Sequence, residues 1–197
     1  GVVLSTGEFQ ITVTDLEIPG RGFPFRLART YRSKSDLAGS LLGYNWTLNL
    51  DEYLTPGTWE DTNTGASAYC PAVQWQMGNR LSDIWVKQCA PGHNQQWKAF
   101  LGFFGQIRPL GTNLGYQIRY PDGTVKTYAQ EGRNALDQVI WILTKVEDRN
   151  GNFMTIQHNS TKRGIDWIAD TLGRKITFLY DADHRLTTVT DFNNPTR

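Results

Sequence analysis

The sequence predicts an all-β fold that is built largely from stacked β-hairpins. Apolar and polar residues alternate along many segments, which is the pattern of half-buried strands. The chain contains 19 glycines and 8 prolines, and many of them fall between these segments, where turns are expected. A pattern of two aliphatic residues followed by Asp, and then by Gly or Asn, also recurs near the carboxyl end. A fixed period of roughly 20 residues indicates a stacked-repeat architecture.

Composition and charge exclude several classes of protein. The 197 residues carry 20 basic and 19 acidic side chains, 39% of the residues are hydrophobic, and 20% are charged. A chain of this composition is not intrinsically disordered. A net charge of +1 argues against nucleic acid or an anionic membrane as the main partner. No window approaches 18 consecutive apolar residues, so we expect no membrane span.

Residues 1–54 form the first of three expected parts. Alternation predicts strands in residues 9–14, 25–32 and 43–50. The stretch Ile18–Phe25 holds two prolines and two glycines, which exclude a helix or a central strand there. The first five residues lack the basic start and apolar core of a signal peptide. We therefore expect either that a leader has been removed or, as we favour, that the chain belongs to a larger protein.

Residues 55–113 are expected to form an irregular insertion. The segment is rich in Thr, Asn, Gly and Gln, with isolated tryptophans, and each Trp is able to anchor a large area of a surface-packed excursion. One helix is expected between Ala72 and Gln88, interrupted at Gly78.

Residues 114–197 carry the hairpin repeats. Asp148, Asp170 and Asp191 follow one another at intervals of 22 and 21 residues, each preceded by two aliphatic positions. An Asp that opens a turn accepts a hydrogen bond from the backbone two residues on, and a Gly three residues later tolerates positive φ. The expected turn positions are Asp148, Gly151, Asp170, Gly173, Asp191 and Asn194. Apolar return strands follow at 152–158 and 174–180, and each hairpin must pack on its neighbours to bury one face.

The carboxyl-terminal residues resemble a known repeat. The stretch Tyr180-Asp181-Ala-Asp-His-Arg-Leu, together with Asp170-Thr-Leu-Gly-Arg before it, is similar to the tyrosine–aspartate (YD) repeat of rearrangement-hotspot (Rhs) proteins. Asp181 is therefore a further turn position. His184 stands where the repeat has Gly, and His158-Asn159 stands where the preceding copy would have Tyr-Asp.

The amino-terminal residues strengthen the resemblance. Segments 6–9, 14–25 and 29–33 resemble the opening of an Rhs core, and Gly43-Tyr-Asn-Trp46 resembles the Gly-x-x-Trp segment that follows it. The resemblance covers residues 1–50 and 114–197 and leaves the middle unmatched.

The resemblance implies a large secreted or cell-surface protein whose YD repeats coil into a hollow β-shell around a toxic C-terminal domain. Residues 1–54 would open that shell, and residues 114–197 would form its first hairpins, as part of a curled sheet. The chain would then be a non-catalytic structural segment. Its partners would be further YD repeats, of the same chain or of identical chains, and its effector would lie beyond residue 197.

The sequence gives little support for an enzyme activity. It contains no G-x-S-x-G, P-loop or H-E-x-x-H motif. The recurrence of Asp at a turn-opening position favours a turn role over acid–base pairs. The period differs from that of nonapeptide calcium repeats, and the cysteines lack zinc spacing. We expect no enzyme activity, no cofactor and no metal.

The alternative function is that of a carbohydrate- or cell-surface-binding adhesion module. Four tryptophans lie in polar surroundings that are rich in Asn and Gln, where flat rings stack on sugars and amides bind hydroxyl groups. The candidate sugar-stacking residues are Trp59, Trp75, Trp85 and Trp97. The competing interpretation is that these tryptophans are simply packed in the insertion. Surface glycans would be partners only if the chain is an adhesion module.

Two further features bear on location and partners. Cys70 and Cys89 are either two buried thiols or a disulfide. We favour the disulfide, which would indicate an oxidising compartment. The basic run Arg21–Lys34 has acidic residues on both sides, so we interpret it as a solvated or ion-paired strand rather than a nucleic-acid site.

Overall fold

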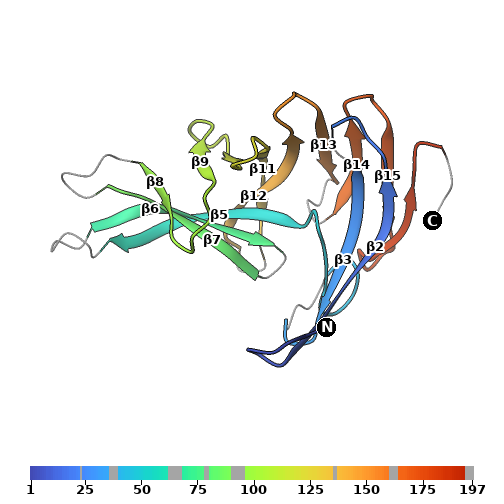
Figure 1. Cartoon of the computed structure of the whole chain (residues 1–197), viewed down its shortest axis with the longest axis horizontal. Coiled ribbons are helices and arrows are strands. Elements are labelled where there is room, and N and C mark those ends of the chain that lie inside the picture. Colours follow the sequence, from blue (N-terminus) through green and yellow to red (C-terminus); the bar gives the residue numbers. More distant parts are fainter. Residues whose placement is uncertain are drawn as a thin grey trace. The chain divides into compact units, whose positions relative to one another are not determined.

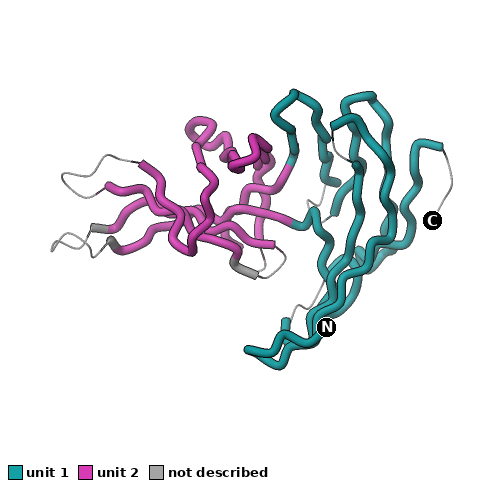
Figure 2. Tube along the Cα trace, viewed as in Figure 1, with its two compact units in different colours: residues 1–51, 144–197 teal, residues 52–143 magenta. Residues whose placement is uncertain are grey.

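The structure is a computed structural model of the chain, and it describes residues 1–22, 24–35, 40–61, 68–77, 80–89, 96–134, 137–159 and 164–193. Strands joined by turns make up its regular secondary structure, which confirms the all-β fold (Figure 1). Among the described residues, no helix has the length and apolar character needed to cross a membrane. The chain divides into two compact units, residues 1–51 with 144–197 and residues 52–143 (Figure 2).

Sixteen strands follow one another along the described parts of the chain. They are β1 (Val2–Val3), β2 (Glu8–Ile18), β3 (Phe25–Arg32), β4 (Trp46–Leu48), β5 (Glu52–Asp61), β6 (Ala68–Met77), β7 (Arg80–Lys87), β8 (Trp97–Ala99), β9 (Gln106–Pro109), β10 (Tyr116–Arg119), β11 (Val125–Arg133), β12 (Val139–Glu147), β13 (Phe153–His158), β14 (Ile165–Asp170), β15 (Lys175–Tyr180) and β16 (Leu186–Thr190).

The first unit contains an antiparallel sheet of order β1-β2-β3-β4, which we call the N-terminal sheet. Its centre is the hairpin β2–β3, whose register runs from Gln10 opposite Arg32 to Ile18 opposite Phe25. Pro19 and Gly20 follow β2, in agreement with the break expected after Ile18. A bulge between Thr14 and Leu16 shifts the register of β2.

The second sheet of this unit is made of the carboxyl-terminal hairpins, which we call the repeat wall. β13, β14, β15 and β16 are successive antiparallel neighbours, and the end of β12 pairs with β13. Neighbouring hairpins therefore pair with one another directly, as the stacked-repeat interpretation requires. Each hairpin supplies two strands to one continuous ladder.

The two sheets of the first unit enclose its core. Leu16, Phe25 and Leu27 of the N-terminal sheet are buried, as are Ile168 and Phe178 of the repeat wall. Ile18 and Phe25 line a residual cavity of about 10 Å³ together with side chains from the wall, which are Met154, Ile168, Ile176 and Phe192. A space of this size is about that of one water molecule, so the packing between the two sheets is close there.

The second unit has a core of its own. β5, β6, β7 and β8 form one antiparallel ladder, and β9, β10 and β11 form another. Both belong to one sheet, because β5 and β11 each pair with β12. Its largest buried side chains are those of Trp85, Tyr128, Leu54, Ile118 and Leu143.

Two expectations for the middle of the chain are wrong. Residues 72–88 do not form a helix; they belong to β6 and β7, which pair from Ala72 opposite Val86 to Met77 opposite Arg80. Residues 55–113 are not an irregular insertion, because β5 to β9 fall within them. The buried run Ile84-Trp85-Val86 obscures the two-residue period, since this strand is covered on both faces.

The expected three-part division also differs from the observed units. The structure divides the chain at Asp51 and after Leu143, and it joins residues 144–197 to residues 1–51. The N-terminal sheet has one apolar face, and the repeat wall supplies the apolar face that covers it.

Candidate functional site: the repeat wall and its turns

One turn recurs at three places in the repeat wall. Each begins at an aspartate, and the three are Asp148, Asp170 and Asp181. The Asp N–H donates to the carbonyl four residues on at 2.8, 3.1 and 2.9 Å, respectively. The N–H three residues on donates back to the Asp carbonyl at 3.2, 2.9 and 3.0 Å. The same closed loop at each hairpin fixes the strand register in the same way.

The aspartate side chains close these turns. In each turn, Oδ1 accepts the N–H groups two and four residues on, over distances of 2.8–3.0 Å. Oδ2 binds the side chain four residues on: Asn152, Arg174 or Arg185. These bonds are the reason why Asp is the residue type at this position.

The third residue after each aspartate adopts the left-handed conformation. Gly151 and Gly173 have φ of 81° and 75°, and His184, which stands in the Gly slot, has φ of 62°. A non-glycine residue there costs about 1 kcal/mol. At Asp191, Oδ1 accepts the N–H of Asn193 at 2.8 Å, which is the first bond of the same pattern. Asn194 lies outside the described residues.

The electrostatics of the three turns agree with these contacts. The side-chain hydrogen bond from Asn152 lowers the pKa of Asp148, and backbone and side-chain bonds from Arg185 lower the pKa of Asp181. Burial alone would raise the pKa of Asp170, but bonds from Arg174 and from backbone N–H groups outweigh it and lower this pKa. All three turns are therefore stabilised by the ionised carboxylate.

The return strands present one buried face. Met154, Ile156 and His158 on β13 are buried, and Ile176 and Phe178 repeat the pattern on β15. Tyr180 completes the second set, and its hydroxyl donates to the Ile165 carbonyl at 2.9 Å. Burial raises the pKa of Tyr180 to about 12. Met154 and Ile176 of this face lie opposite Ile18 and Phe25 of the N-terminal sheet.

Two turns of the second unit share this backbone pattern but not its sequence. Tyr120–Thr124 and Asn134–Gln138 show the same pair of backbone hydrogen bonds. The first is the hairpin that the Asp-Gly pair of residues 122–123 indicates. The second was missed, because it opens with Asn134 and has Asp137 in the left-handed position, with φ of 57°.

The structure does not bring the four tryptophans together as a sugar site. Trp85 and Trp75 are 0% and 8% exposed, and both rings pack against Phe103 with centroids 5.7 and 5.3 Å apart. They are core residues, so the expectation that they stack on sugars is wrong. Trp59 and Trp97 are half-buried; Trp59 packs on Phe100, and Trp97 lies edge-on to Tyr116.

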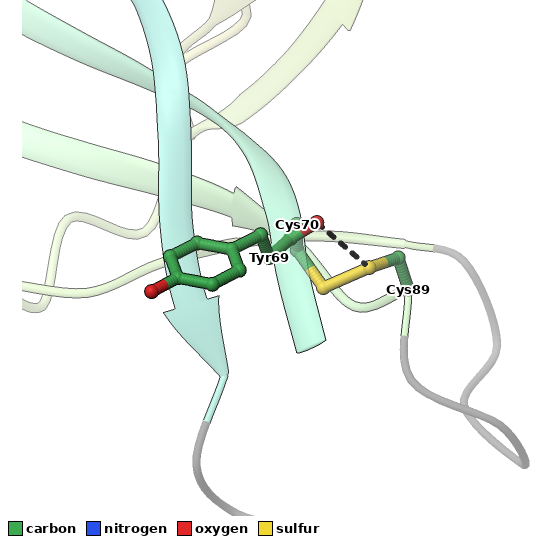
Figure 3. Close-up of a disulfide and its surroundings, with 3 residues drawn as sticks. All are labelled: Tyr69, Cys70 and Cys89. Atoms are coloured by element: carbon green, nitrogen blue, oxygen red, sulfur yellow. Dashed lines mark hydrogen bonds between the residues drawn. A yellow bond between two sulfur atoms is a disulfide. The ribbon is translucent and has the colours of Figure 1, made fainter. Parts of the chain in front are cut away.

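Cys70 and Cys89 form a disulfide, which is shown in Figure 3. Cys70 is fully buried on β6 in a cluster with Ala72, Ile84 and Val86, and Trp59 packs against this cluster. Cys89 Sγ lies 3.9 Å from the Tyr69 carbonyl oxygen. The bridge ties the start of β6 to the segment after β7.

Two buried carboxylates in the second unit were missed from the sequence. Glu52, only 3% exposed, accepts from Lys126 at 2.5 Å, Tyr128 at 2.8 Å and Trp75 at 3.2 Å. Their positions in the sequence are far apart, and only the ladder brings them together. Asp83, 1% exposed, binds backbone N–H groups of the loop after β8.

This combination of hairpin ladder, recurrent aspartate turns and covering sheet defines a stacked-hairpin repeat protein. Comparison with known proteins specifies the class further. Residues 1–68 match a domain of unknown function (DUF6531), and residues 168–196 match the RHS repeat. The chain is an Rhs/YD-repeat protein. No curated protein matches it.

One solved structure supports the same fold. The chain is similar to a chain in the crystal structure of TcdB2-TccC3-Cdc42, with a TM-score of 0.52 and 11% sequence identity. The similarity covers 88% of this chain and 11% of that one. The chain therefore spans about a ninth of the length of the solved protein it matches.

Proposed function

We propose that these residues open a β-shell of YD repeats and have a non-catalytic, structural role in it. The observation that carries this proposal is the close packing of the N-terminal sheet on the first hairpins, where a space of only about 10 Å³ remains. The N-terminal sheet covers one face of the repeat wall at its first hairpins. The DUF6531 match lies before the RHS-repeat match along the chain, and this order supports a position at the opening of the shell.

We further propose that the shell encloses or carries an effector that is not part of residues 1–197. The small share of the matched solved chain that is covered, 11%, supports a role as one segment of a larger assembly. The turn carboxylates are each occupied by several hydrogen bonds, which supports a structural use of these groups rather than a chemical one.

Export from the cytoplasm belongs to the same proposal. The Cys70–Cys89 disulfide supports it, because disulfides persist mainly in oxidising compartments. We do not extend the proposal to carbohydrate binding, since two of the four candidate tryptophans are core residues.

The size and shape of the native protein test the proposal. Antibodies against residues 1–197 are used to isolate the native polypeptide, whose mass is measured and whose particles are imaged by electron microscopy. We expect a polypeptide several times larger than 22.4 kDa that forms a hollow particle and is found outside the cytoplasm. A mature native chain of 22.4 kDa would contradict the shell.

A further inference from the structure

The loop between β8 and β9 (residues 100–105), which we call the β8–β9 loop, exposes three large apolar side chains (Figure 1). Phe100 is 60% exposed, Leu101 is 56% exposed and Phe104 is 90% exposed. Between them, Gly102 has φ of 96°, and a Cβ at this position would have no atom within 4 Å. The apex of the loop therefore lies in open space. Large apolar side chains that gather on a surface mark a place of interaction, whereas single ones do not.

The second unit holds the backbone of this loop in place while the three side chains stay outside. The buried carboxylate of Asp83 accepts three backbone N–H groups of the loop at 2.8–3.1 Å. The Phe103 ring packs inward against Trp75 and Trp85, and the Trp85 indole N–H donates to the Gly105 carbonyl at 3.4 Å. A loop that is already ordered pays little conformational entropy when it binds a partner.

The charges of this region are of one sign. The chain as a whole has a net charge of +1, but the stretch from Ile84 to Pro121 contains four basic residues and no Asp or Glu. The basic residues are Lys87, Lys98, Arg108 and Arg119. The acidic residue that follows this stretch, Asp122, accepts the N–H of Thr124 in its own turn at 2.8 Å. The argument from net charge against an anionic membrane therefore does not apply locally.

Two of the four cations flank the β8–β9 loop. Lys98 is exposed and lies two residues before Phe100, whose N–H continues the β7–β8 ladder, so both side chains lie on one face of it. At the other end of the loop, a Cβ on Gly105 would be 2.9 Å from the Arg119 carbonyl oxygen. Arg119 is exposed and lies opposite Gln106 in the β9–β10 pair.

A third cation extends the basic surface away from the loop. Arg108 is exposed and lies two residues after Gln106, so it shares a face of the β9–β10 pair with Arg119. The opposite face of this pair carries Ile107 and Ile118, which are buried. The solvent-facing side of β9 and β10 is therefore basic beside the loop.

Apolar side chains between exposed cations have the chemistry that fits an anionic lipid surface. Phe and Leu enter the boundary between headgroups and acyl chains, and Lys and Arg attract anionic headgroups. A second copy of this chain fits less well, because two such loops in contact would bring like charges together.

We propose that the β8–β9 loop is a site of contact with an anionic lipid bilayer, in which Leu101 and Phe104 enter the surface and Lys98 and Arg119 bind lipid phosphates. The loop lies on the bilayer and does not cross it. This inference goes beyond the shell-opening role and does not rest on it.

Co-sedimentation of the 197-residue chain with lipid vesicles tests the proposal. One vesicle preparation contains phosphatidylcholine alone, and the other contains equal parts of phosphatidylcholine and anionic phosphatidylglycerol. We expect binding to the anionic vesicles, and binding at least about tenfold weaker to the neutral ones. Brominated acyl chains should quench tryptophan fluorescence of the bound chain, because the Trp59 ring packs on Phe100 with centroids 5.4 Å apart.

The apolar contribution is measured with the double variant Leu101→Ser and Phe104→Ser. It should bind anionic vesicles about tenfold or more weakly than the original chain, because two side chains no longer enter the bilayer. The control is Leu172→Ser with Leu179→Ser, at leucines of the repeat wall that are 57% and 59% exposed, and it should bind within about twofold of the original chain. Circular dichroism checks that both variants fold.

The contribution of charge is measured with Lys98→Gln and Arg119→Gln. Each substitution should weaken binding to anionic vesicles by about fivefold. The control, Arg149→Gln with Arg185→Gln, removes the same charge from exposed residues in turns of the repeat wall and should weaken binding by less than about twofold in total.

Four results would overturn the proposal. They are binding of the original chain to neither vesicle, equal affinity for neutral and anionic vesicles, undiminished binding by the Leu101 and Phe104 double variant, and absence of quenching by brominated lipid. Self-association that disappears in the double variant, without vesicle binding, would instead assign the loop to a second copy and would also overturn it. The mass of the native polypeptide does not enter this test, so the shell and the lipid contact stand or fall separately.

Discussion

Arg174 donates from Nη2 to the carbonyl of Pro19 at 2.8 Å, across 155 residues of sequence. The same guanidinium pairs with Asp170 in its own turn and lies over the Phe192 ring at 4.7 Å. One side chain therefore links a repeat turn to the end of β2 in the N-terminal sheet. The Gly-Arg pair that marks the repeat thus has a role beyond closing its turn.

Arg174→Ala should destabilise the first unit by roughly 1–2 kcal/mol, because it removes a charge-assisted hydrogen bond to the N-terminal sheet and a cation–π contact. Urea unfolding monitored by circular dichroism measures this loss. Arg185→Ala is the matched control: Arg185 makes the same bonds to Asp181, but its side chain is 58% exposed, so we expect a loss below about 1 kcal/mol. Equal losses would show that the link to Pro19 contributes nothing.

The three turn aspartates make stability fall in acid. The pKa values of Asp148, Asp170 and Asp181 are lowered in the folded chain. Because the unfolded chain binds protons first, at about pH 4, their contribution is present above that pH and is lost as the pH falls through the lowered pKa values. Thermal unfolding between neutral pH and pH 2 measures the slope.

Replacing Asp148 with Asn separates the charge from the shape of the turn. Asn134 already opens a turn of this kind and accepts the Gln138 N–H at 2.9 Å, so Asp148→Asn should fold with the turn retained. We expect a loss of stability near neutral pH, because the ionised carboxylate and the bond that its Oδ2 accepts from Asn152 are removed, and a shallower further loss in acid, because Asn does not titrate. An unchanged slope for the triple Asn variant at 148, 170 and 181 would rule out these groups as its source.

The stability of the second unit depends on the buried carboxylate of Glu52. All three of its side-chain partners, Lys126, Tyr128 and Trp75, donate to it, and Gln offers only one acceptor oxygen. Glu52→Gln leaves the Lys126 ammonium, 18% exposed, without a counter-ion, which costs about 3–5 kcal/mol. Tyr128→Phe removes one neutral donor and should cost only about 1 kcal/mol. Denaturant unfolding compares the two variants.

Tyr128 reports on the same cluster. Burial, and then the charge of Glu52, raise its pKa well above the ordinary value. A raised tyrosine pKa stabilises the fold below about pH 10, and this contribution is lost as the pH rises further, since the unfolded chain gives up its proton first. Spectrophotometric titration should therefore show Tyr128 ionising only as the chain unfolds; ionisation in the folded chain would contradict the burial.

The turns in the carboxyl-terminal half of the first unit were predictable from sequence, because the residues that form each turn are close together in the chain. An Asp that binds backbone two residues on, and a residue in the left-handed slot, lie within four positions of each other, so the spacing of Asp148 and Asp170 reveals the turns. The turn that contains His184 was predicted only from the resemblance of Tyr180-Asp181 and the residues after it to the YD repeat.

The second unit was not predictable in this way. Trp75 and Trp85 lie in polar sequence but are core residues, because β6 and β7 are covered by the loop after β8, which no local pattern indicates. Glu52 and Lys126 are 74 positions apart, and nothing in either neighbourhood pairs them. The grouping of residues 1–51 with 144–197 likewise depends on two apolar faces meeting across the whole chain.

Asp83 binds the backbone of the apolar loop that follows β8. Its Oδ1 accepts the N–H groups of Phe100 and Leu101 at 3.1 and 2.8 Å, and its Oδ2 accepts that of Phe103 at 2.9 Å. These bonds turn the Phe103 ring inward, to within 5.0 Å of the Tyr120 ring by centroid, while Phe104 remains 90% exposed. The carboxylate therefore holds the loop in a conformation in which Phe103 packs inward and Phe104 is exposed to solvent.

Asp83→Asn should cost about 1–3 kcal/mol, because the amide nitrogen of Asn is a donor and leaves one backbone N–H of the loop without an acceptor. As Phe103 loosens from Trp75 and Trp85, tryptophan fluorescence should shift to longer wavelength before global unfolding. Asp122→Asn is the control: Asp122 accepts the Thr124 N–H through Oδ1 at 2.8 Å, which Asn is able to keep, so we expect a change within about 0.5 kcal/mol. If Asp83→Asn leaves both stability and fluorescence unchanged, the loop is held by its aromatic packing and not by the carboxylate.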